Sequence, residues 1–307
     1  MNKTVFQAET DGFHGAWYPC ADGSRKGIIA MIGDSSEDRM VVSAVKWLHR
    51  LGVHVMAMSP DEKDYGYHNY PLECFGKAIA YMKEQGCEKI GIVGGSTTGM
   101  LALIAASYYP EDISLTAAFS PSDFVMEGFI RDGKDGVTER PCDNESTVSW
   151  QGKPLPYLPY AYRHPEYWLK VKEESKETGN MIASRGLFEE SERRYPIQEE
   201  EKIKVENIRG RIILVGAEDD VLWNTCKYIK RIQQRLAERP HDSSVTALTY
   251  EHGTHFVYPD SMLRIMLPIG SSLLVGLMFK DGRRYSKECR QTRIDIDQKV
   301  RGAILEW

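Results

Sequence analysis

A serine stands where a run of strand-forming residues passes directly into a run of helix-forming residues. In the stretch KIGIVGGSTTGMLALIAA (89–106), two glycines precede Ser96. Glycines let the backbone bend sharply, so Ser96 would project its hydroxyl above the strand end, where the N–H of Thr97 could stabilise an oxyanion. Thr98 replaces the second glycine of the usual Gly-x-Ser-x-Gly pattern. Because glycine-rich turns also bind phosphate or merely pack closely, this turn alone does not identify a nucleophile.

Candidate partners for a nucleophilic serine follow two later strand-like runs. A serine hydroxyl attacks efficiently only when a base takes its proton and a carboxylate orients that base. The run RIILVGA is followed by EDDVLW, which contains Asp219 and Asp220, and the run VTALTYE is followed by HGTHF, which contains His255. Serine, acid and histidine in this chain order, each on a loop after a strand, are typical of α/β-hydrolases.

Each of the two later loops offers alternatives. His255 lies deeper in its loop than His252 and precedes an aromatic residue, so we favour His255 as the base. Asp219 fits a Gly-x-x-Asp count, whereas Asp220 fits an Asp-x-x-Trp unit, which leaves both acids open. A metal site at the two histidines has no evident third ligand, so we expect neither a metal nor another cofactor.

A second oxyanion donor is expected from the loop after an earlier strand. The segment MIGDSSEDR occupies that place, and Ser35 or Ser36 could supply the N–H. The segment lacks the glycine-rich HGGG pattern, and a plain turn before a helix capped by Asp34 or Ser36 explains it equally well.

The elements that must position these loops form a repeating pattern. Short apolar runs alternate with longer amphipathic ones, which predicts a largely parallel sheet covered by helices. The predicted strands are residues 27–33, 53–59, 89–95, 114–120, 211–217 and 245–251. The helix-like segments between them include EDRMVVSAVKWLHRLG, PLECFGKAIAYMKEQG and WNTCKYIKRIQQRLAER. Parallel strands end at one edge of a sheet, so the three loops would converge in a single α/β-hydrolase domain spanning residues 1–307.

The alternation stops between residues 121 and 208. This region is dense in proline and aromatics and then in charge, which favours a lid-like insertion within the domain over a separate domain; a solvated helical appendage is the alternative. Aromatic lid residues would suit an apolar or aromatic acyl group, but they could equally pack the lid onto the body. These residues are Tyr157, Tyr160, Tyr162, Tyr167 and Trp168.

Composition excludes several classes of function. A net charge of −5 and a pI near 6.0 provide no basic field for nucleic acid or an anionic membrane. The six cysteines include no C-x-x-C pair, and the N-terminus has no apolar signal region, so a cytoplasmic protein is expected. The most apolar stretch, residues 261–279, is interrupted by Arg264 and Pro268, which predicts a buried helix pair and no membrane span.

With these residues in place, the chain resembles the C-terminal domain of the acyl-CoA thioester hydrolase and bile acid-CoA:amino acid N-acyltransferase family. The resemblance rests on YPLECFGKAIAYM, GIVGGSTTGMLAL, SWQGKPLPYLPY, IKVENIRGRIILVGAEDDVLW, HGTHF and the terminal DGRRYSKECRQTRIDIDQKVRGAILEW. It implies that Ser96 is the nucleophile, that His255 is the base, and that Asp220, rather than Asp219, is the acid. The acyltransferase branch has cysteine at the nucleophile position, so serine resembles the hydrolase branch.

These observations predict a serine hydrolase that cleaves an acyl thioester of the acyl-CoA type, or an ester, through an acyl-enzyme. Animal-type members of the family carry an N-terminal β-sandwich domain, in whose place about 25 leading residues stand here. The alternatives are a carboxylesterase, lactone hydrolase or peptidase on the same fold, or a non-catalytic binding protein. The partner would be a small-molecule substrate, while the acyl chain, the pathway and the oligomeric state stay open.

Overall fold

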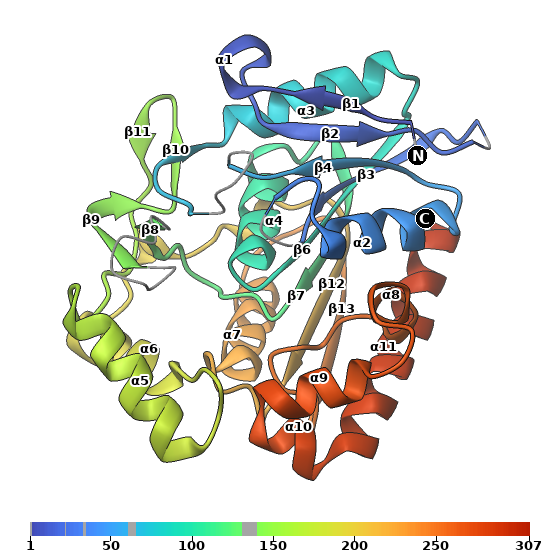
Figure 1. Ribbon diagram of the computed structural model, residues 1–307. Helices are drawn as coiled ribbons and strands as arrows, with labels where there is room; N and C mark the ends of the chain where they lie inside the picture. The colour runs from blue at the N-terminus through green and yellow to red at the C-terminus, as the bar shows by residue number, and fades with distance from the viewer. Residues whose placement is uncertain (1, 22, 33–34, 61–65, 131–139) are drawn as a thin grey trace.

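A central sheet, eight strands among the described residues, organises the chain (Figure 1). The computed structural model describes residues 2–21, 23–32, 35–60, 66–130 and 140–307. In spatial order the strands are β1 (Thr4–Phe6), β2 (Gly15–Tyr18), β4 (His54–Met58), β3 (Lys26–Met31), β6 (Lys89–Gly95), β7 (Ile113–Phe119), β12 (Gly210–Ala217) and β13 (Ser243–Tyr250). β2 pairs antiparallel with β1 and with β4, and the remaining neighbours are parallel. The predicted, mostly parallel sheet is confirmed, and β1 and β2 extend it beyond the prediction.

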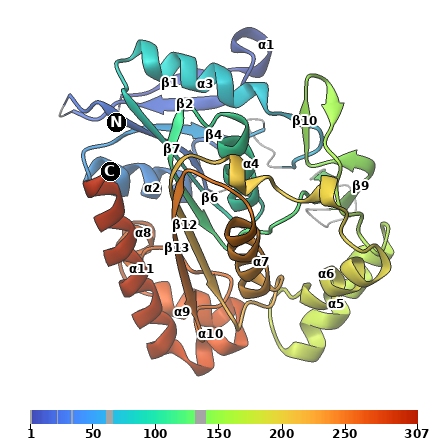
Figure 2. The ribbon, with the colours of Figure 1, turned by 180° about the vertical axis from the view of Figure 1, so that it is seen from behind.

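Helices cover both faces of the sheet, as Figure 2 shows from behind. Side chains alternate between the faces of a strand, so Ile28 and Ala30 of β3 lie in one core, whereas Ile29 and Met31 lie in the other. One core contains α2 (Arg39–His49), α8 (Asp260–Met266) and α11 (Ser286–Glu306). The other contains α3 (Glu73–Glu84), α4 (Thr97–Tyr108) and α7 (Thr225–Glu238). The helix-like segments of the sequence correspond to α2, α3 and α7.

The helix that follows Ser96 is buried all round. Every residue of α4 from Thr98 to Ser107 is buried, because the sequence TGMLALIAAS is almost wholly apolar. Such a helix fits the interior of a protein and not its surface. The turn that carries Ser96 therefore connects the central strand β6 to this buried helix.

The C-terminal end of α11 is hydrogen-bonded to residues at the amino ends of the parallel strands. Trp307 is 8% exposed, and its Nε1 donates to Ser114 Oγ at 2.9 Å. Lys89 Nζ at the start of β6 donates to the Trp307 carbonyl at 3.0 Å, and Lys26 Nζ at the start of β3 donates to the Ile304 carbonyl at 3.2 Å. These cations satisfy carbonyl groups that the last turn of a helix leaves unpaired.

The insertion between β7 and β12 folds into short elements packed on the body. They are β8 (Glu127–Ile130), β9 (Arg140–Ser146), β10 (Val148–Trp150), β11 (Lys153–Pro154), α5 (Glu166–Thr178), α6 (Arg185–Arg194), η1 (Glu199–Glu201) and η2 (Val205–Asn207). β10 also pairs with β5 (Tyr70–Pro71), which precedes α3. Phe124, Leu158 and Phe188 belong to the same core as α4 and α7, so the insertion shares the main core. In Figures 1 and 2 the insertion and α11 lie on opposite sides of the sheet.

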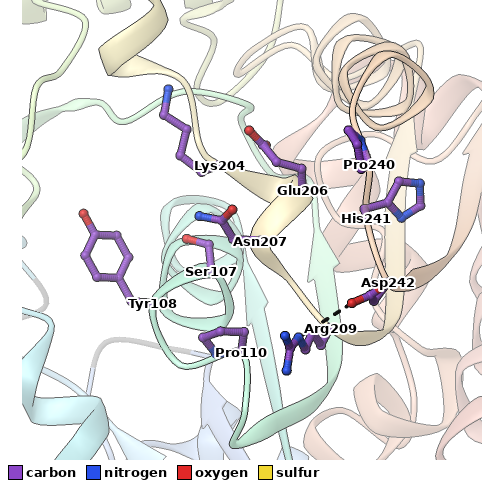
Figure 3. Close-up of a pocket in the computed structure, with 10 residues that line it drawn as sticks. All are labelled: Ser107, Tyr108, Pro110, Lys204, Glu206, Asn207, Arg209, Pro240, His241 and Asp242. Atoms are coloured by element: carbon purple, nitrogen blue, oxygen red, sulfur yellow. Dashed lines mark ion pairs between the residues drawn. The ribbon is translucent and has the colours of Figure 1, made fainter.

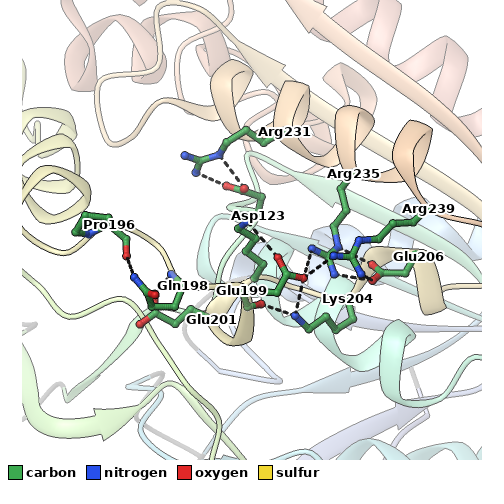
Figure 4. A network of polar contacts seen from close by, with 11 residues as sticks. Asp123, Pro196, Gln198, Glu199, Glu201, Lys204, Glu206, Arg231, Arg235 and Arg239 are labelled. Carbon is green, nitrogen blue, oxygen red and sulfur yellow. Dashed lines mark hydrogen bonds and ion pairs between the residues drawn. The ribbon is translucent and has the colours of Figure 1, made fainter.

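A row of arginines on α7 joins the insertion to the body (Figure 4). Arg231 and Arg235 are spaced four residues apart on α7, so they lie along one side of the helix, and Arg239 follows directly after the helix ends. Arg231 Nε donates to Asp123 at 2.8 Å, and Arg235 Nε donates to Glu206 at 2.6 Å. Charge-assisted pairs of this kind fix the geometry of the segments they join.

The apolar stretch near the C-terminus forms α8 and α9 (Ser271–Met278), followed by α10 (Lys280–Arg284). The predicted helix pair is confirmed. The predicted burial is wrong for α9 and the residues before it, because Ile269 is 93% exposed and Leu273 and Leu277 are each 68% exposed. Within the described residues, no single helix is long and apolar enough to cross a membrane. α8 and α9, bent by 95°, reach that length and apolarity only as a pair.

Candidate active site

The turn at Ser96 has the backbone of a strained strand-to-helix junction. Ser96 has φ 61° and ψ −130°, a backbone conformation that residues other than glycine rarely adopt. It persists only when the surrounding structure stabilises it. A Cβ on Gly94 would lie 2.0 Å from the Thr98 carbonyl oxygen, and a Cβ on Gly95 would lie 2.2 Å from the Tyr258 hydroxyl. The two glycines are therefore required by close contacts on both sides of the turn.

Thr98, the departure from the usual pattern, is accommodated by hydrogen bonds. Its Oγ1 accepts from the Gly95 N–H at 2.9 Å and lies within hydrogen-bond distance of the carbonyl oxygens of Gly95 and Met31. Thr98 is 9% exposed, and its side chain stabilises the turn through these hydrogen bonds. The glycine of the usual pattern would leave the Gly95 N–H without this acceptor.

Asp220 and His255 meet at the carboxyl ends of β12 and β13. His255 Nδ1 lies 2.8 Å from Asp220 Oδ2, and since a carboxylate can only accept, Nδ1 carries the proton. Asp220 is fully buried and also accepts from Thr225 Oγ1 at 2.5 Å and from the Leu222 N–H at 2.9 Å. These donors satisfy the carboxylate and fix its orientation towards the imidazole.

Asp219 makes a different set of contacts. Its Oδ1 accepts from the N–H groups of Gly253 and Thr254 at 3.0 and 2.7 Å, and its Oδ2 lies 3.4 Å from His252 Nδ1. Burial raises the pKa of Asp219, although the two N–H groups partly offset that effect. Asp219 thus holds the loop that presents His255, whereas Asp220 contacts the imidazole itself.

Ser96 and His255 line a common cavity of about 330 Å³. Its wall is mostly apolar and aromatic, and it contains no Lys, Arg, Asp or Glu among the described residues. Tyr160, Tyr167 and Trp168 of the insertion lie in this wall, whereas Tyr157 and Tyr162 do not. The remaining lining residues are Met40, Tyr67, Gly95, Thr97, Thr98, Phe129, Val171, Ile182, Ser184, Phe188, Leu222, Trp223, Phe256 and Tyr258.

The polar groups at this cavity are suited to proton transfer and to binding an oxyanion. His255 Nε2 is buried and has no hydrogen-bond partner among the described residues, so the lone pair opposite the Asp220 contact is available. Trp223 lies edge-on to the His255 ring at 5.2 Å and donates its Nε1–H to the Ser120 carbonyl at 3.1 Å. Thr97 is the first residue of α4, where backbone N–H groups have no acceptor within the helix.

The expected second oxyanion donor is not brought to the cavity. The Ser35 N–H donates to Asp38 Oδ2 at 3.3 Å, and Ser35 does not line the wall. The Ser36 N–H donates to Ser59 Oγ at 3.1 Å. Asp38 accepts from the Val41 N–H as the cap of α2, which draws this loop towards the helix start. Gly33 and Asp34 lie outside the described residues.

Several residues of the site were not identified from the sequence. Thr225 and Tyr258 gave no signal, because the contacts that matter join them to loops distant in sequence. Trp223 was detectable only as the end of the Asp-x-x-Trp unit.

A larger hollow of about 610 Å³, whose lining residues Figure 3 shows, does not include Ser96 in its wall. Its wall includes Arg209 and Asp242, each of which immediately precedes a parallel strand, and Pro110, which lies three residues before β7. It therefore lies at the amino ends of the strands, opposite the carboxyl ends where ligands of open α/β sheets bind. Arg209 Nε there lies 3.9 Å from Asp242. The described wall of this hollow shares no residue with the wall of the Ser96 cavity.

Comparison with known structures supports the fold. An α/β hydrolase from a Medee basin deep-sea metagenome library is 13% identical, with a TM-score of 0.54 over 100% of this chain and 99% of that chain. An esterase from Pyrococcus furiosus is 15% identical, with a TM-score of 0.48 over 92% of this chain and 89% of that chain. At 13% identity the similarity to the deep-sea enzyme shows the fold alone, which is that of the α/β hydrolases.

Sequence comparison identifies the family. None of the curated proteins matches the chain. Residues 70–262, more than half of the chain, match the family model described as BAAT / acyl-CoA thioester hydrolase C terminal. The match includes the turn at Ser96, the insertion and the loops of Asp220 and His255. The chain therefore belongs to the BAAT / acyl-CoA thioester hydrolase C-terminal family.

Proposed function

We propose that this α/β-hydrolase enzyme cleaves an acyl thioester or ester, with Ser96 as nucleophile, His255 as general base and Asp220 as the acid that orients the base. One observation carries the proposal: His255 Nδ1 lies 2.8 Å from Asp220, its Nε2 has no hydrogen-bond partner among the described residues, and His255 lines the same cavity as Ser96. The φ of 61° at Ser96 supports it, because strain of this kind is concentrated at active sites.

The reaction proceeds in two halves through an acyl-enzyme. Ser96 Oγ attacks the acyl carbonyl as His255 Nε2 takes its proton, and the N–H of Thr97 binds the oxyanion. His255 then gives the proton to the leaving thiol or alcohol as the bond to the acyl carbon breaks. In the second half, His255 takes a proton from water and the hydroxide attacks the acyl carbon; the bond from that carbon to Ser96 Oγ then breaks, the carboxylic acid leaves, and the proton passes from His255 to Ser96 Oγ. Asp220 stabilises the imidazolium in both halves.

The cavity favours a neutral, apolar acyl group. A charged acyl chain would lose its hydration without gaining an ionic partner from the described wall, which is costly. Tyr160, Tyr167 and Trp168 provide flat apolar contact area. In an acyl-CoA the phosphates belong to the leaving group, so they would lie outside this cavity while the acyl chain lies within it.

Labelling with a fluorophosphonate probe tests the nucleophile. The wild type should be labelled and Ser96→Ala should not, with a loss of ester hydrolysis of about 10⁴-fold or more. Ser107→Ala is the matched control, because Ser107 lies at the other end of α4 and bonds to the Ile104 carbonyl. Equal labelling of Ser96→Ala and wild type would refute the assignment, and absence of labelling in both would favour a binding protein. Comparing acyl-CoAs with simple esters of the same acyl group then separates thioesterase from esterase activity.

A further inference from the structure

A second cluster of metal-ligating side chains lies outside the Ser96 cavity. It consists of His68, from the segment before β5, and of Cys142 and Glu145 from β9. One ligand atom of each residue lies within 4.8 Å of those of the other two, and His68 Nδ1 lies 2.9 Å from Glu145 Oε2. None of the three lines the cavity, and none takes part in the proposed hydrolysis.

The backbone on both sides of His68 is fixed to the segment that carries the other two residues. The Tyr67 carbonyl accepts from the Phe129 N–H of β8 at 2.9 Å. The Asn69 N–H donates to the Ser146 carbonyl of β9 at 2.6 Å, and Asn69 Oδ1 accepts from the Ser146 N–H at 3.2 Å. The approach of His68 to β9 is thus held by main-chain contacts and does not depend on a flexible side chain alone.

An irregularity in β9 brings Cys142 and Glu145 together. In a regular strand, residues three apart point to opposite faces, so these two side chains would be separated. Here the register shifts between Glu127 and Phe129, and β9 has additional residues opposite this step. Asn144, within the added residues, has φ 64°, a left-handed conformation that asparagine tolerates better than most residues. Bulges of this kind often re-aim side chains at functional sites.

The three donors match one class of cation. In a tetrahedral zinc site, bond lengths of about 2.0–2.3 Å place neighbouring ligand atoms roughly 3.3–3.7 Å apart, so only small side-chain adjustments are required here. Sulfur and imidazole nitrogen select zinc-like ions, whereas calcium and magnesium prefer oxygen throughout. Thiolate and carboxylate together neutralise a divalent cation, and the partial exposure of the cluster leaves a fourth position for water.

We propose that His68, Cys142 and Glu145 bind one divalent cation of the zinc class. The cation would cross-link the segment before β5 to the β8–β9 hairpin. Tyr67 and Phe129, which are joined by the hydrogen bond described above, both line the Ser96 cavity. Binding would therefore stiffen one wall of that cavity without contacting the reacting groups.

Cobalt is the probe that reports directly on the thiolate. Reduced, chelator-treated full-length protein is titrated with Co²⁺, and a near-ultraviolet thiolate-to-cobalt charge-transfer band should saturate at about one ion per chain and disappear when Zn²⁺ is added. The other five cysteines are buried, so Cys142→Ser should abolish the band. His68→Ala and Glu145→Gln should weaken Co²⁺ binding by about tenfold or more.

Asp143→Asn is the matched control, because it removes one negative charge from the same strand without removing a ligand. Asp143 is 60% exposed and lies 3.5 Å from Arg163, and this variant should bind Co²⁺ as the wild type does. Circular dichroism of each variant establishes that it is folded. The proposal is overturned if folded wild type gives no band, if Cys142→Ser retains it, or if Asp143→Asn weakens binding as much as Glu145→Gln.

Discussion

At the scale of single residues, two adjacent carboxyl groups after β12 have separate tasks. Asp220 contacts the His255 imidazole, and Asp219 accepts from the backbone of the loop that carries His255. Removing the charge of Asp220 should therefore slow the proton transfers of His255. Removing the charge of Asp219 should weaken only the hydrogen bonds that hold the loop.

Substituting each acid by its amide separates these tasks. Asp220→Asn should lower kcat by about 10⁴-fold, because an amide NH₂ no longer favours the imidazole tautomer with a proton on Nδ1. In Asp219→Asn the amide oxygen still accepts from Gly253 and Thr254, so the loss should stay below about 100-fold. Steady-state kinetics on one ester measures both variants. A larger loss in Asp219→Asn than in Asp220→Asn would reverse the assignment.

At the scale of elements, the turn between β6 and α4 depends on the absence of a side chain at Gly94. A Cβ there would lie 2.0 Å from the Thr98 carbonyl oxygen, an atom of the buried helix backbone that cannot move freely. Gly94→Ala should therefore lower the free energy of unfolding by about 1–3 kcal/mol. Urea unfolding followed by circular dichroism measures the change.

Gly302 of α11 provides the matched alanine substitution. Within the part of the chain that the structure describes, no atom outside its own helix lies within 4 Å of a Cβ placed on Gly302. Gly302→Ala should therefore raise the free energy of unfolding by about 0.5–1 kcal/mol, because alanine loses less backbone entropy in a helix. If Gly94→Ala were as stable as Gly302→Ala, close packing at the turn would not be what requires glycine there.

Elements with a strong local sequence pattern were predictable, and elements that depend on pairing with distant segments were not. The bounds of β6, residues 89–95, agree with the prediction, because a buried run of β-branched residues is enclosed by a charged turn and the serine. β5 and β10 have two and three residues and exist only because they pair across a long stretch of chain. The proximity of Cys142 to Glu145 likewise depends on the left-handed backbone at Asn144, which a sequence pattern does not reveal.

The same distinction applies to the site. That Asp220 and His255 lie close together was predictable because strand ends of a parallel sheet converge and because of the family resemblance. The placement of Ser35 was not predictable, since it depends on whether a neighbouring side chain takes its N–H, as Asp38 does.

At the scale of the whole molecule, the insertion is held to the body by hydrogen bonds to a largely buried carboxylate. Glu192 of α6 accepts from Lys227 at 2.8 Å, from the Tyr228 hydroxyl at 3.0 Å and from Arg231 at 2.7 Å, all on α7. Burial alone would raise the pKa of Glu192, but the hydrogen bonds from Lys227 and Arg231 outweigh it and hold the pKa below the ordinary value of 4.5.

Glu192→Gln should therefore destabilise the protein by about 1–3 kcal/mol near neutral pH. A carboxyl whose folded pKa is lowered stabilises the fold above its unfolded pKa and loses that contribution as the pH falls through the folded pKa. The difference in unfolding free energy between wild type and Glu192→Gln should thus stay constant from pH about 7 to about 5.5 and shrink as the pH falls below the ordinary carboxyl pKa of 4.5. Urea unfolding across this range measures it.

Glu190→Gln is the control on the same helix. Glu190 pairs with Arg193 and Arg194 of α6 itself, so its loss removes no contact between the insertion and the body. Such local surface pairs contribute little to stability, and this variant should unfold nearly as the wild type does. An equal cost for both substitutions would show that Glu192 does not hold the insertion in place.

The uncharged wall of the Ser96 cavity affects how the protein responds to salt. Dissolved ions weaken attractions and repulsions between charges, and the described wall has no charged side chain with which an acyl chain could interact. Recognition of a neutral ester should then be nearly the same in dilute and in concentrated buffer. A substrate with a polyanionic leaving group would instead meet a protein of net charge −5, and ionic strength would govern its rate of encounter while leaving the fit of its acyl chain unchanged.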